Sequence, residues 1–350
     1  MYTALLFLTL LTYLIGKATK RIEPFYFLAV LLALFCGLRG EFVGRDTHSY
    51  QEIFKYVAQG ETTHIVEFGY LFFLKFIIYL GGTQQLVFLI FASLTVFCFV
   101  KFIKSYSNNI YLSLLIFVFI GPFYLSTFNQ MRQYLAIGIF LAYLLPIIER
   151  KEFLKFIIIL LTTTFFVHAS AILLLPVYFL IDKKLHLHSK VIYIVLFNTA
   201  IGFLIIFLLR TPYGYFLTAL GDVKVGLVLF VIQIAISVVM LLLEKNILKI
   251  QPNKKIFFNM AYLSIFMLIP IFINKNIPAE IFIRMNNYFF PFMIILVPET
   301  LKLFSTKSKP IVLSFLIVFL SLYYIRGSII MGEFYDLVPY NVNTNLFTFL

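Results

Sequence analysis

Ten apolar runs, separated by short loops that carry most of the basic residues, restrict this chain to a membrane fold. A membrane-spanning helix needs about 20 consecutive apolar residues. The runs lie at residues 2–16, 24–38, 84–104, 109–126, 131–148, 189–209, 224–243, 256–274, 281–303 and 310–326. The chain contains 62% hydrophobic and 12% charged residues. A soluble protein of this composition could not bury all its apolar side chains and would expose a large apolar surface. We predict an all-α polytopic integral membrane protein, in which residues 1–350 form a single transmembrane domain with about ten full spans.

Two further apolar stretches are too irregular for a full span. We expect residues 67–82 to form a short re-entrant or interfacial element that ends at a pair of glycines. We expect residues 153–181 to form a hairpin of two short helices with its tip near His168. The alternative is that 153–181 is one span kinked at Pro176, which would reverse the sidedness of everything after it.

The basic loops predict the orientation, because cytoplasmic loops carry an excess of lysine and arginine. All six basic clusters are cytoplasmic if neither irregular stretch changes sides. Both termini are then outside, residues 39–66 form an outer loop with a short interfacial helix, and residues 327–350 form an outer tail. Orientation explains the net charge of +13, so no nucleic acid is expected. Cys36 and Cys98 fall near opposite faces of the bilayer, which argues against a disulfide.

Arginine is distributed differently from lysine. Of the 18 basic residues in the cytoplasmic clusters, 16 are lysine, whereas six of the eight arginines fall on the outer side. A planar guanidinium suits phosphate and carboxylate recognition, while a compact ammonium is enough for orientation. The alternative is chance segregation in small numbers. We interpret the outer arginines as binding groups for an anionic substrate.

The stretch 128–136 sets Arg132 and three amides between two apolar runs. Ionisable groups at membrane depth are costly, which favours a functional role; the alternative is a side chain that reaches the headgroups from a helix end. Asn129, or Ser126 or Thr127 before it, is expected to cap the following helix, with Arg132 in its first turn. The start of this helix and Arg132 would together form an anion-binding site on the outer face. Arg284 is expected near the start of run 281–303, so that one pyrophosphate would fit between the two helix ends.

Asp46, Glu67 and His168 are candidate acids and bases on the outer side. Asp46 beside a glycine is ordinary turn chemistry as well as a candidate acceptor for a sugar hydroxyl. Glu67 fits a helix N-terminus equally well, and His168 fits a structural hydrogen bond equally well. Arg210 lies in an aromatic loop that suits sugar stacking or a headgroup interface. The chain has no Walker loop, HExxH or CxxC motif, so we expect neither cofactor nor metal.

Several short motifs follow one another along nearly the whole chain. They are Leu38-Arg39, Gly44-x-Asp46-Thr47-x-x-Tyr50, Glu67-x-Gly69-Tyr70, Asn129-x-x-Arg132-Gln133-x-x-Ala136, His168-x-Ser170-Ala171 with Pro176, Arg284-x-x-x-Tyr288 and Pro339-Tyr340. In this order they resemble the EpsG family of bacterial polysaccharide biosynthesis proteins, which are Wzy-like polymerases of lipid-linked repeat units. One departure is Val167, which separates Phe166 from His168 where an aromatic residue is expected beside the histidine.

The resemblance implies a glycosyltransferase of GT-C character in the bacterial cytoplasmic membrane, with its active site on the outer face. It would move a growing glycan from undecaprenyl pyrophosphate onto the next lipid-linked repeat unit, giving O-antigen, capsule or exopolysaccharide. The lipid-linked oligosaccharide is then both donor and acceptor. Membrane lipids and a chain-length-regulating co-polymerase are the other candidate partners. Inversion of the anomeric centre follows from the reaction class, and arginines with helix ends would stabilise the pyrophosphate without a metal.

On this interpretation Asp46 is the first candidate for the catalytic base, followed by His168 and Glu67. The candidate substrate-binding residues are Arg39, Arg45, Asn129, Arg132, Gln133, Arg210, Arg284 and Tyr288. The rival interpretations are a flippase or exporter of lipid-linked oligosaccharide, a glycan ligase, an acyltransferase that uses His168, and a non-catalytic membrane partner. An exporter would need polar residues along a path through the bilayer, whereas the polar groups here gather on one predicted side.

Overall fold

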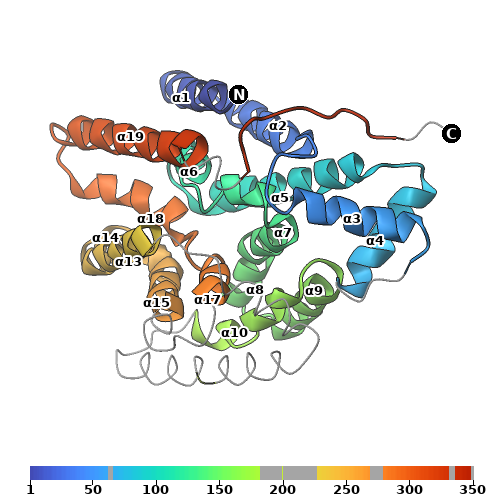
Figure 1. Cartoon of the computed structure of the whole chain (residues 1–350). Helices are drawn as coiled ribbons and strands as arrows, with labels where there is room; N and C mark the ends of the chain where they lie inside the picture. Colours follow the sequence, from blue (N-terminus) through green and yellow to red (C-terminus); the bar gives the residue numbers. More distant parts are fainter. Residues whose placement is uncertain (62–65, 182–198, 200–226, 269–278, 331–335, 348–350) are drawn as a thin grey trace. The chain divides into compact units, whose positions relative to one another are not determined.

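The structure is a computed structural model that describes residues 1–61, 66–181, 199, 227–268, 279–330 and 336–347. These residues are mainly helical, with no β-strand and only two isolated antiparallel bridges, Arg39 with Val342 and Gly82 with Phe347. The predicted run 189–209, apart from residue 199, and Arg210 lie outside the described residues. The chain divides into two compact units, Met1–Pro146 with Ile158–Ala171 and Phe304–Leu350, and Ile147–Ile157 with Ile172–Leu303. Figure 1 labels the helices along the chain.

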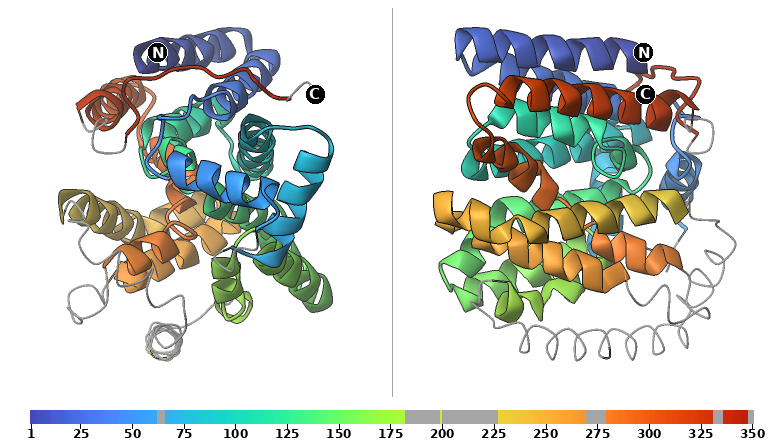
Figure 2. Two further views of the ribbon diagram at one scale, coloured as in Figure 1. Left: turned by 45° about the vertical axis from the view of Figure 1, so that its right-hand side comes forward. Right: turned by 90° about the vertical axis from the view of Figure 1, so that its left-hand side faces the viewer.

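The first unit is built around α5, which packs against α2 and α7. Its helices are α1 (Tyr2–Thr19), α2 (Glu23–Gly37), α3 (Thr47–Ala58), α4 (Phe68–Tyr79), α5 (Gln84–Tyr106), α6 (Ile110–Phe119), α7 (Met131–Ile139) and α19 (Lys309–Ile325). The last turns of α7 run through a π-helical segment, Phe140–Leu144, into α8 (Leu145–Glu149). The helix α9 (Phe153–Phe166) and a following 3₁₀ segment, Ala169–Leu174, pass from one unit to the other. The right-hand view of Figure 2 shows α1 and α19, in dark blue and red, running alongside each other.

The second unit is built around α15. Its helices are α10 (Val177–Leu180), α13 (Leu227–Leu242), α14 (Glu244–Ile250), α15 (Lys255–Leu268), α17 (Ala279–Asn286) and α18 (Phe292–Thr300). Among them, α15 packs against α13, α17 and α18. The predicted run 281–303 is thus interrupted, because turns at residues 287–291 separate α17 from α18, whose N-cap residue is Pro291.

Four of the described helical segments are long and apolar enough to cross a membrane. They are Tyr2–Thr19, Gln84–Tyr106, Met131–Glu149 and Lys309–Ser328. A fifth is added if Val231–Leu242 and Glu244–Ile250, bent by 55°, form one span. Helices α2, α4, α6 and α9 are apolar but shorter. The chain is therefore a helical membrane protein, and the count of about ten spans stays a prediction.

Three short elements occur where the sequence predicts them. The loop 39–66 contains α3, whose Tyr50 and Val57 are buried, and the stretch 67–82 contains α4. The 12 residues of α4 extend about 18 Å, which is less than the thickness of a bilayer core. In the stretch 153–181 the helix breaks at residues 167–168, at the predicted tip. Whether this stretch forms a hairpin or one kinked span in the membrane stays a prediction.

The C-terminal segment 336–347 is fastened along the loop that follows α2 and to the start of α5. Backbone hydrogen bonds join Gly40 N to Asn341 O, Asn343 N to Leu38 O, and Thr83 N to Leu346 O, each 2.9 Å long. The ring of Tyr340 stacks on Phe35, with ring centroids 4.4 Å apart. The segment therefore ties together the loop and the two helices that precede and follow the α3–α4 region.

Candidate functional site

Glu67 is the residue immediately before α4, and its position is set by a close contact between α4 and α9. Its backbone is extended, with φ −61° and ψ 144°, and the helix begins at Phe68. Gly69 in the first turn lies directly against Phe166, so that any Cβ at this position would collide with the α9 backbone. This contact brings the start of α4 next to the helix break at His168.

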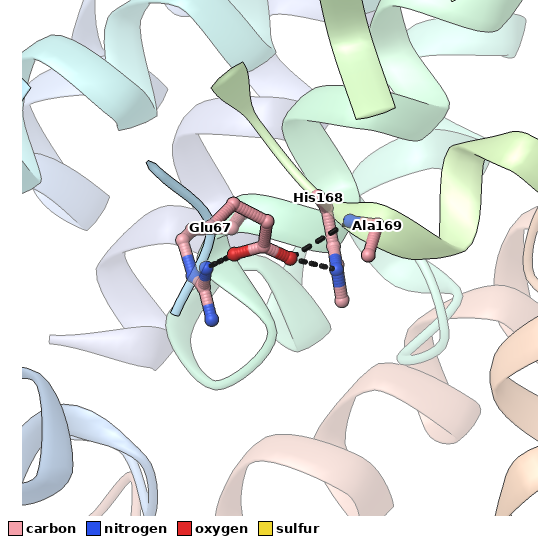
Figure 3. Close-up of polar contacts among 4 residues, drawn as sticks. Glu67, His168 and Ala169 are labelled. Carbon is pink, nitrogen blue, oxygen red and sulfur yellow. Dashed lines mark hydrogen bonds and ion pairs between the residues drawn. The ribbon is translucent and has the colours of Figure 1, made fainter. Parts of the chain in front are cut away.

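Three donors from distant parts of the chain converge on the Glu67 carboxylate. Arg132 Nη1, in the first turn of α7, forms an ion pair with Oε2. His168 Nδ1 lies 3.2 Å from Oε1, and the backbone nitrogen of Ala169 donates to the same oxygen over 2.7 Å. Figure 3 shows these last two contacts on one side of the carboxylate. The side chains of Glu67, Arg132 and His168 are 10%, 13% and 25% exposed, so the histidine is the most accessible of the three.

The surroundings of Glu67 decide its protonation state and the tautomer of His168. Burial raises the pKa of the Glu67 carboxyl, but the hydrogen bond from His168 and the charge of Arg132 outweigh burial and lower that pKa from 4.5 to about 2. Glu67 is therefore ionised at neutral pH and can only accept hydrogen bonds. Nδ1 of His168 must then carry a hydrogen, which leaves Nε2 as the basic nitrogen of the neutral ring.

Arg132 is held by aromatic rings as well as by Glu67. Its guanidinium carbon lies 4.8 Å from the centroid of the Tyr70 ring and 5.9 Å from that of Tyr50. These distances are typical of cation–π contacts. Its Nε atom is buried and has no hydrogen-bond partner among the described residues. The guanidinium thus keeps donor capacity beyond the ion pair with Glu67.

Arg39, predicted to bind substrate, has a different environment. Its side chain is fully buried, and its guanidinium donates to Cys36 O over 2.9 Å and to Thr47 Oγ1 over 3.3 Å. The guanidinium carbon lies 4.0 Å from the Phe88 ring centroid, with Phe128 on another side at 5.8 Å. Among the described residues no carboxylate forms an ion pair with Arg39. These contacts hold Arg39 in the packing at the junction of α2, α3 and α5, and its Nη2 is buried without a hydrogen-bond partner among the described residues.

The loop before α3 is joined to the turn before α7. Gly44 has φ +98°, and a Cβ there would lie 2.8 Å from the carbonyl oxygen of Phe128. The next backbone nitrogen, of Arg45, donates to Asn129 Oδ1 over 2.7 Å. Asn129 was expected to cap α7, but α7 follows Gln130 without a side-chain cap, because the Asn129 side chain is used by the loop. Asp46 is the N-cap residue of α3, half-buried beside the exposed Arg45.

The other predicted residues are placed as follows. Gln133 is 2% exposed and lies in α7. Tyr288 is 1% exposed in the second unit. Arg284 is the sixth of the eight residues of α17 and lies in its last turn, about one turn after the helix begins. That one pyrophosphate fits between Arg132 and Arg284 stays a prediction. Among the described residues no cluster of three His, Cys, Asp or Glu side chains could hold a metal ion.

Two groups at the site were not among the predicted site residues, the tyrosines that surround Arg132 and the backbone nitrogen of Ala169. Tyr70 lies three residues after Glu67, a spacing that puts neighbouring side chains on one side of a helix start. That spacing was a usable signal. Nothing in the sequence indicates that Ala169 N would bind the carboxylate, since this depends on where α9 ends.

Comparison with known proteins gives one match. No curated protein and no solved structure matches the chain significantly. The model of the EpsG family matches residues 23–342, which include Glu67, Arg132, His168 and the C-terminal segment up to its bridge with Arg39. Since the match extends over most of the 350 residues, the chain belongs to the EpsG family.

Proposed function

We propose that this protein is a polysaccharide polymerase, a glycosyltransferase that joins undecaprenyl-pyrophosphate-linked repeat units into O-antigen, capsule or exopolysaccharide. The observation that carries the proposal is the Glu67 carboxylate shared by Arg132 and His168. Glycosyl transfer from a pyrophosphate needs a base for the acceptor hydroxyl and a cation for the leaving group. Membership of a family of polysaccharide biosynthesis proteins and the apolar helices support the same class of reaction.

In the proposed reaction His168 is the base. Its Nε2 takes the proton of the acceptor hydroxyl while the hydroxyl oxygen attacks the anomeric carbon of the donor. The bond between this carbon and the pyrophosphate oxygen breaks, and the pyrophosphate leaves with the electron pair. Attack opposite the leaving group inverts the anomeric centre. Glu67 stays ionised, orients the ring and stabilises the imidazolium, so it is a positioning residue.

We assign the donor's pyrophosphate to Arg132. The base and the leaving group must flank the same carbon, and a single carboxylate separates His168 from Arg132. The acceptor's pyrophosphate is a whole repeat unit away from its non-reducing-end hydroxyl, so it would not fit the same place. The guanidinium of Arg132 has more N–H donors than the one that binds Glu67, and such donors can bind a phosphate oxygen in addition to Glu67.

The remaining assignments follow from this one. Asp46, first candidate for the base on sequence grounds, becomes a glycan contact together with the exposed Arg45 at the start of α3. The protein would lie in the bacterial cytoplasmic membrane, with about ten spans in a GT-C-like arrangement and with termini and site on the outer face. Cysteine labelling at positions 184 and 254 tests this orientation; labelling of both from outside would contradict it.

Surface glycan from a deletion strain tests the function. A polymerase mutant should still export single repeat units while the long-chain ladder is lost, and the wild-type gene should restore the ladder. Loss of single units as well would favour an exporter. An unchanged ladder on the lipid carrier with none on the final acceptor would favour a ligase.

A further inference from the structure

The turn before α3 and the turn before α7 are held together at Gly44 and Asn129. The backbone nitrogen of Arg45 donates to Asn129 Oδ1 over 2.7 Å. Because a backbone N–H only donates, the amide atom that faces it is the oxygen of Asn129 and not the nitrogen. A Cβ on Gly44 would lie 2.8 Å from Phe128 O and 3.0 Å from Asn129 Oδ1, so no space is left between the two turns. We call this the Gly44–Asn129 contact.

The Gly44–Asn129 contact lies between two groups of candidate site residues. Arg45 and Asp46, the proposed glycan contacts, are on one side of it. On the other side Arg132 follows Asn129 closely, in the first turn of α7. The helix α3 also contacts Arg132 directly, since the guanidinium carbon lies 5.9 Å from the centroid of the Tyr50 ring. A displaced Gly44–Asn129 contact would therefore shift Arg132 relative to α3 and to the carboxylate that it binds.

We propose that Asn129 is a positioning residue, whose amide oxygen holds the start of α7 against the Arg45–Asp46 turn and thereby sets the place of Arg132. This inference rests on the proposed function, which puts the donor's pyrophosphate at Arg132 and the glycan at the turn. The two must be held in a fixed relation for one anomeric carbon to react. A displacement of about 1 Å can cost about 10²-fold in rate, even when the change lies away from the reacting atoms.

The alternative is a direct contact between Asn129 and the substrate, which would use the Nδ2 donor. Aspartate distinguishes the two roles, because it has the same shape as asparagine, keeps an accepting oxygen for Arg45 N and has no N–H to offer a substrate. Asn129→Ala removes both atoms. A positioning role therefore predicts that Asn129→Asp works where Asn129→Ala does not.

Initial rates of the purified full-length protein test this, with single repeat units extracted from the deletion strain as substrate. In Asn129→Ala kcat should fall about 10- to 100-fold, while KM changes by less than about twofold. Asn129→Asp should restore kcat to within about threefold of wild type. The matched control is Asn109→Ala, which removes the same kind of hydrogen bond, from Leu112 N to Asn109 Oδ1 over 3.2 Å, at the start of α6. It should leave kcat per folded molecule unchanged.

Gly44→Ala disturbs the same contact from the other turn. Its kcat should fall as in Asn129→Ala, and the double variant should be no slower than the slower single variant, because both changes break one contact. The control is Gly60→Ala. Gly60 also has a positive φ, +82° against +98° for Gly44, but a Cβ there would meet nothing within 4 Å. Gly60→Ala thus brings similar backbone strain without a collision and should keep its kcat per folded molecule.

Acid stability reports the place of Arg132 without any substrate. Burial raises the pKa of the Glu67 carboxyl, but the hydrogen bond from His168 and the charge of Arg132 outweigh burial and lower this pKa to about 2. Wild type should therefore lose stability as pH falls from 4.5 towards 2. In Asn129→Ala, with Arg132 displaced, the loss should be less steep, whereas Asn109→Ala should follow wild type.

Any of four results would overturn the proposal: Asn129→Asp as slow as Asn129→Ala, Asn129→Ala as fast as wild type, losses that multiply in the double variant, or an equal loss of kcat in either control. The polymerase proposal fails separately. A less steep loss of acid stability in Asn129→Ala, in a protein whose deletion leaves the polymer ladder intact, would support the placement of Arg132 by Asn129 and contradict the polymerase.

Discussion

Arg39 and Arg132 belong to the same unit and to the same set of predicted substrate-binding arginines, yet their surroundings differ. Arg39 is fully buried between two phenylalanine rings and donates to a backbone carbonyl and a hydroxyl, while its Nη2 has no hydrogen-bond partner among the described residues. Arg132 forms an ion pair with an ionised carboxylate that also binds a partly exposed histidine. A buried arginine that forms no ion pair with a carboxylate contributes to the stability of the fold. An arginine that shares a carboxylate with a candidate base is placed to act on a bound substrate.

The comparison separates two kinds of effect. Changes around Arg132 should lower the rate per folded molecule, because they remove groups that act on the reacting atoms. Changes around Arg39 should lower the amount of folded protein, because they leave buried polar groups without partners. Activity and quantity of folded protein must therefore be measured together for every variant.

The largest effect is expected for His168→Ala. Loss of the base should lower the polymerisation rate by about 10²- to 10⁴-fold, at a normal protein level. The matched control is His48→Ala, an exposed histidine in α3. Initial rates of the purified variants check this, and a rate within twofold of wild type for His168→Ala would remove the histidine from the reaction.

The next prediction compares lysine substitutions at Arg132 and Arg39. Arg132→Lys keeps the charge but removes the fork, so the rate per folded molecule should fall by about 10²- to 10³-fold. Arg39→Lys should instead destabilise the protein by about 2–4 kcal/mol, since buried acceptors lose their donor. Its rate per folded molecule should stay near that of wild type. Thermal unfolding combined with rate measurements decides, and the reverse pattern would show that Arg39 binds substrate.

Acid stability should reveal the lowered pKa of Glu67. A carboxyl with a pKa of about 2 in the folded state and 4.5 unfolded adds stability that is complete above pH 4.5 and is lost as pH falls towards 2. The contribution is on the order of 3 kcal/mol. Wild type should lose stability over this range more steeply than Glu67→Gln. Parallel unfolding curves of the two proteins would mean that Glu67 is not held by Arg132 and His168.

The smallest effect concerns the C-terminal segment. The Tyr340 hydroxyl donates to Phe35 O over 2.5 Å, near Arg39. Tyr340→Phe keeps the ring stacking and should cost only about 1 kcal/mol, with no change in rate per folded molecule. A lower rate at unchanged stability would instead connect the segment with the reaction.

The sequence indicated the helical membrane class and the short elements, because run length and composition determine both. It also indicated Glu67, Arg132 and His168 as candidate site residues, but not that the three side chains meet. Asp46 ranked above Glu67 since it stands beside an arginine in the chain, whereas Arg132 reaches Glu67 only across 65 positions. Such an approach depends on how α4, α7 and α9 pack.

The sequence also did not indicate which polar side chains are buried or held by distant partners. Arg39 follows a helix end between glycines, a place that is usually exposed, and it becomes buried only because Phe88, Phe128 and the C-terminal segment cover it. Asn129 looked like a helix cap, and its amide oxygen is taken by a backbone nitrogen 84 positions away. Short-range sequence patterns predict partners that are close in the sequence. Here Arg39 and Asn129 instead contact residues that are far away in the sequence.

The pH dependence of the rate in wild type and Glu67→Gln tests most directly whether Glu67 unites Arg132 and His168 in one working site. The ionised carboxylate stabilises the protonated form of His168, so its removal should lower the pKa of the histidine. We expect the acidic limb of the rate profile to move to lower pH in Glu67→Gln, together with a lower maximal rate. An acidic limb at the same pH in both proteins would contradict the assignment of His168 as a base oriented by Glu67.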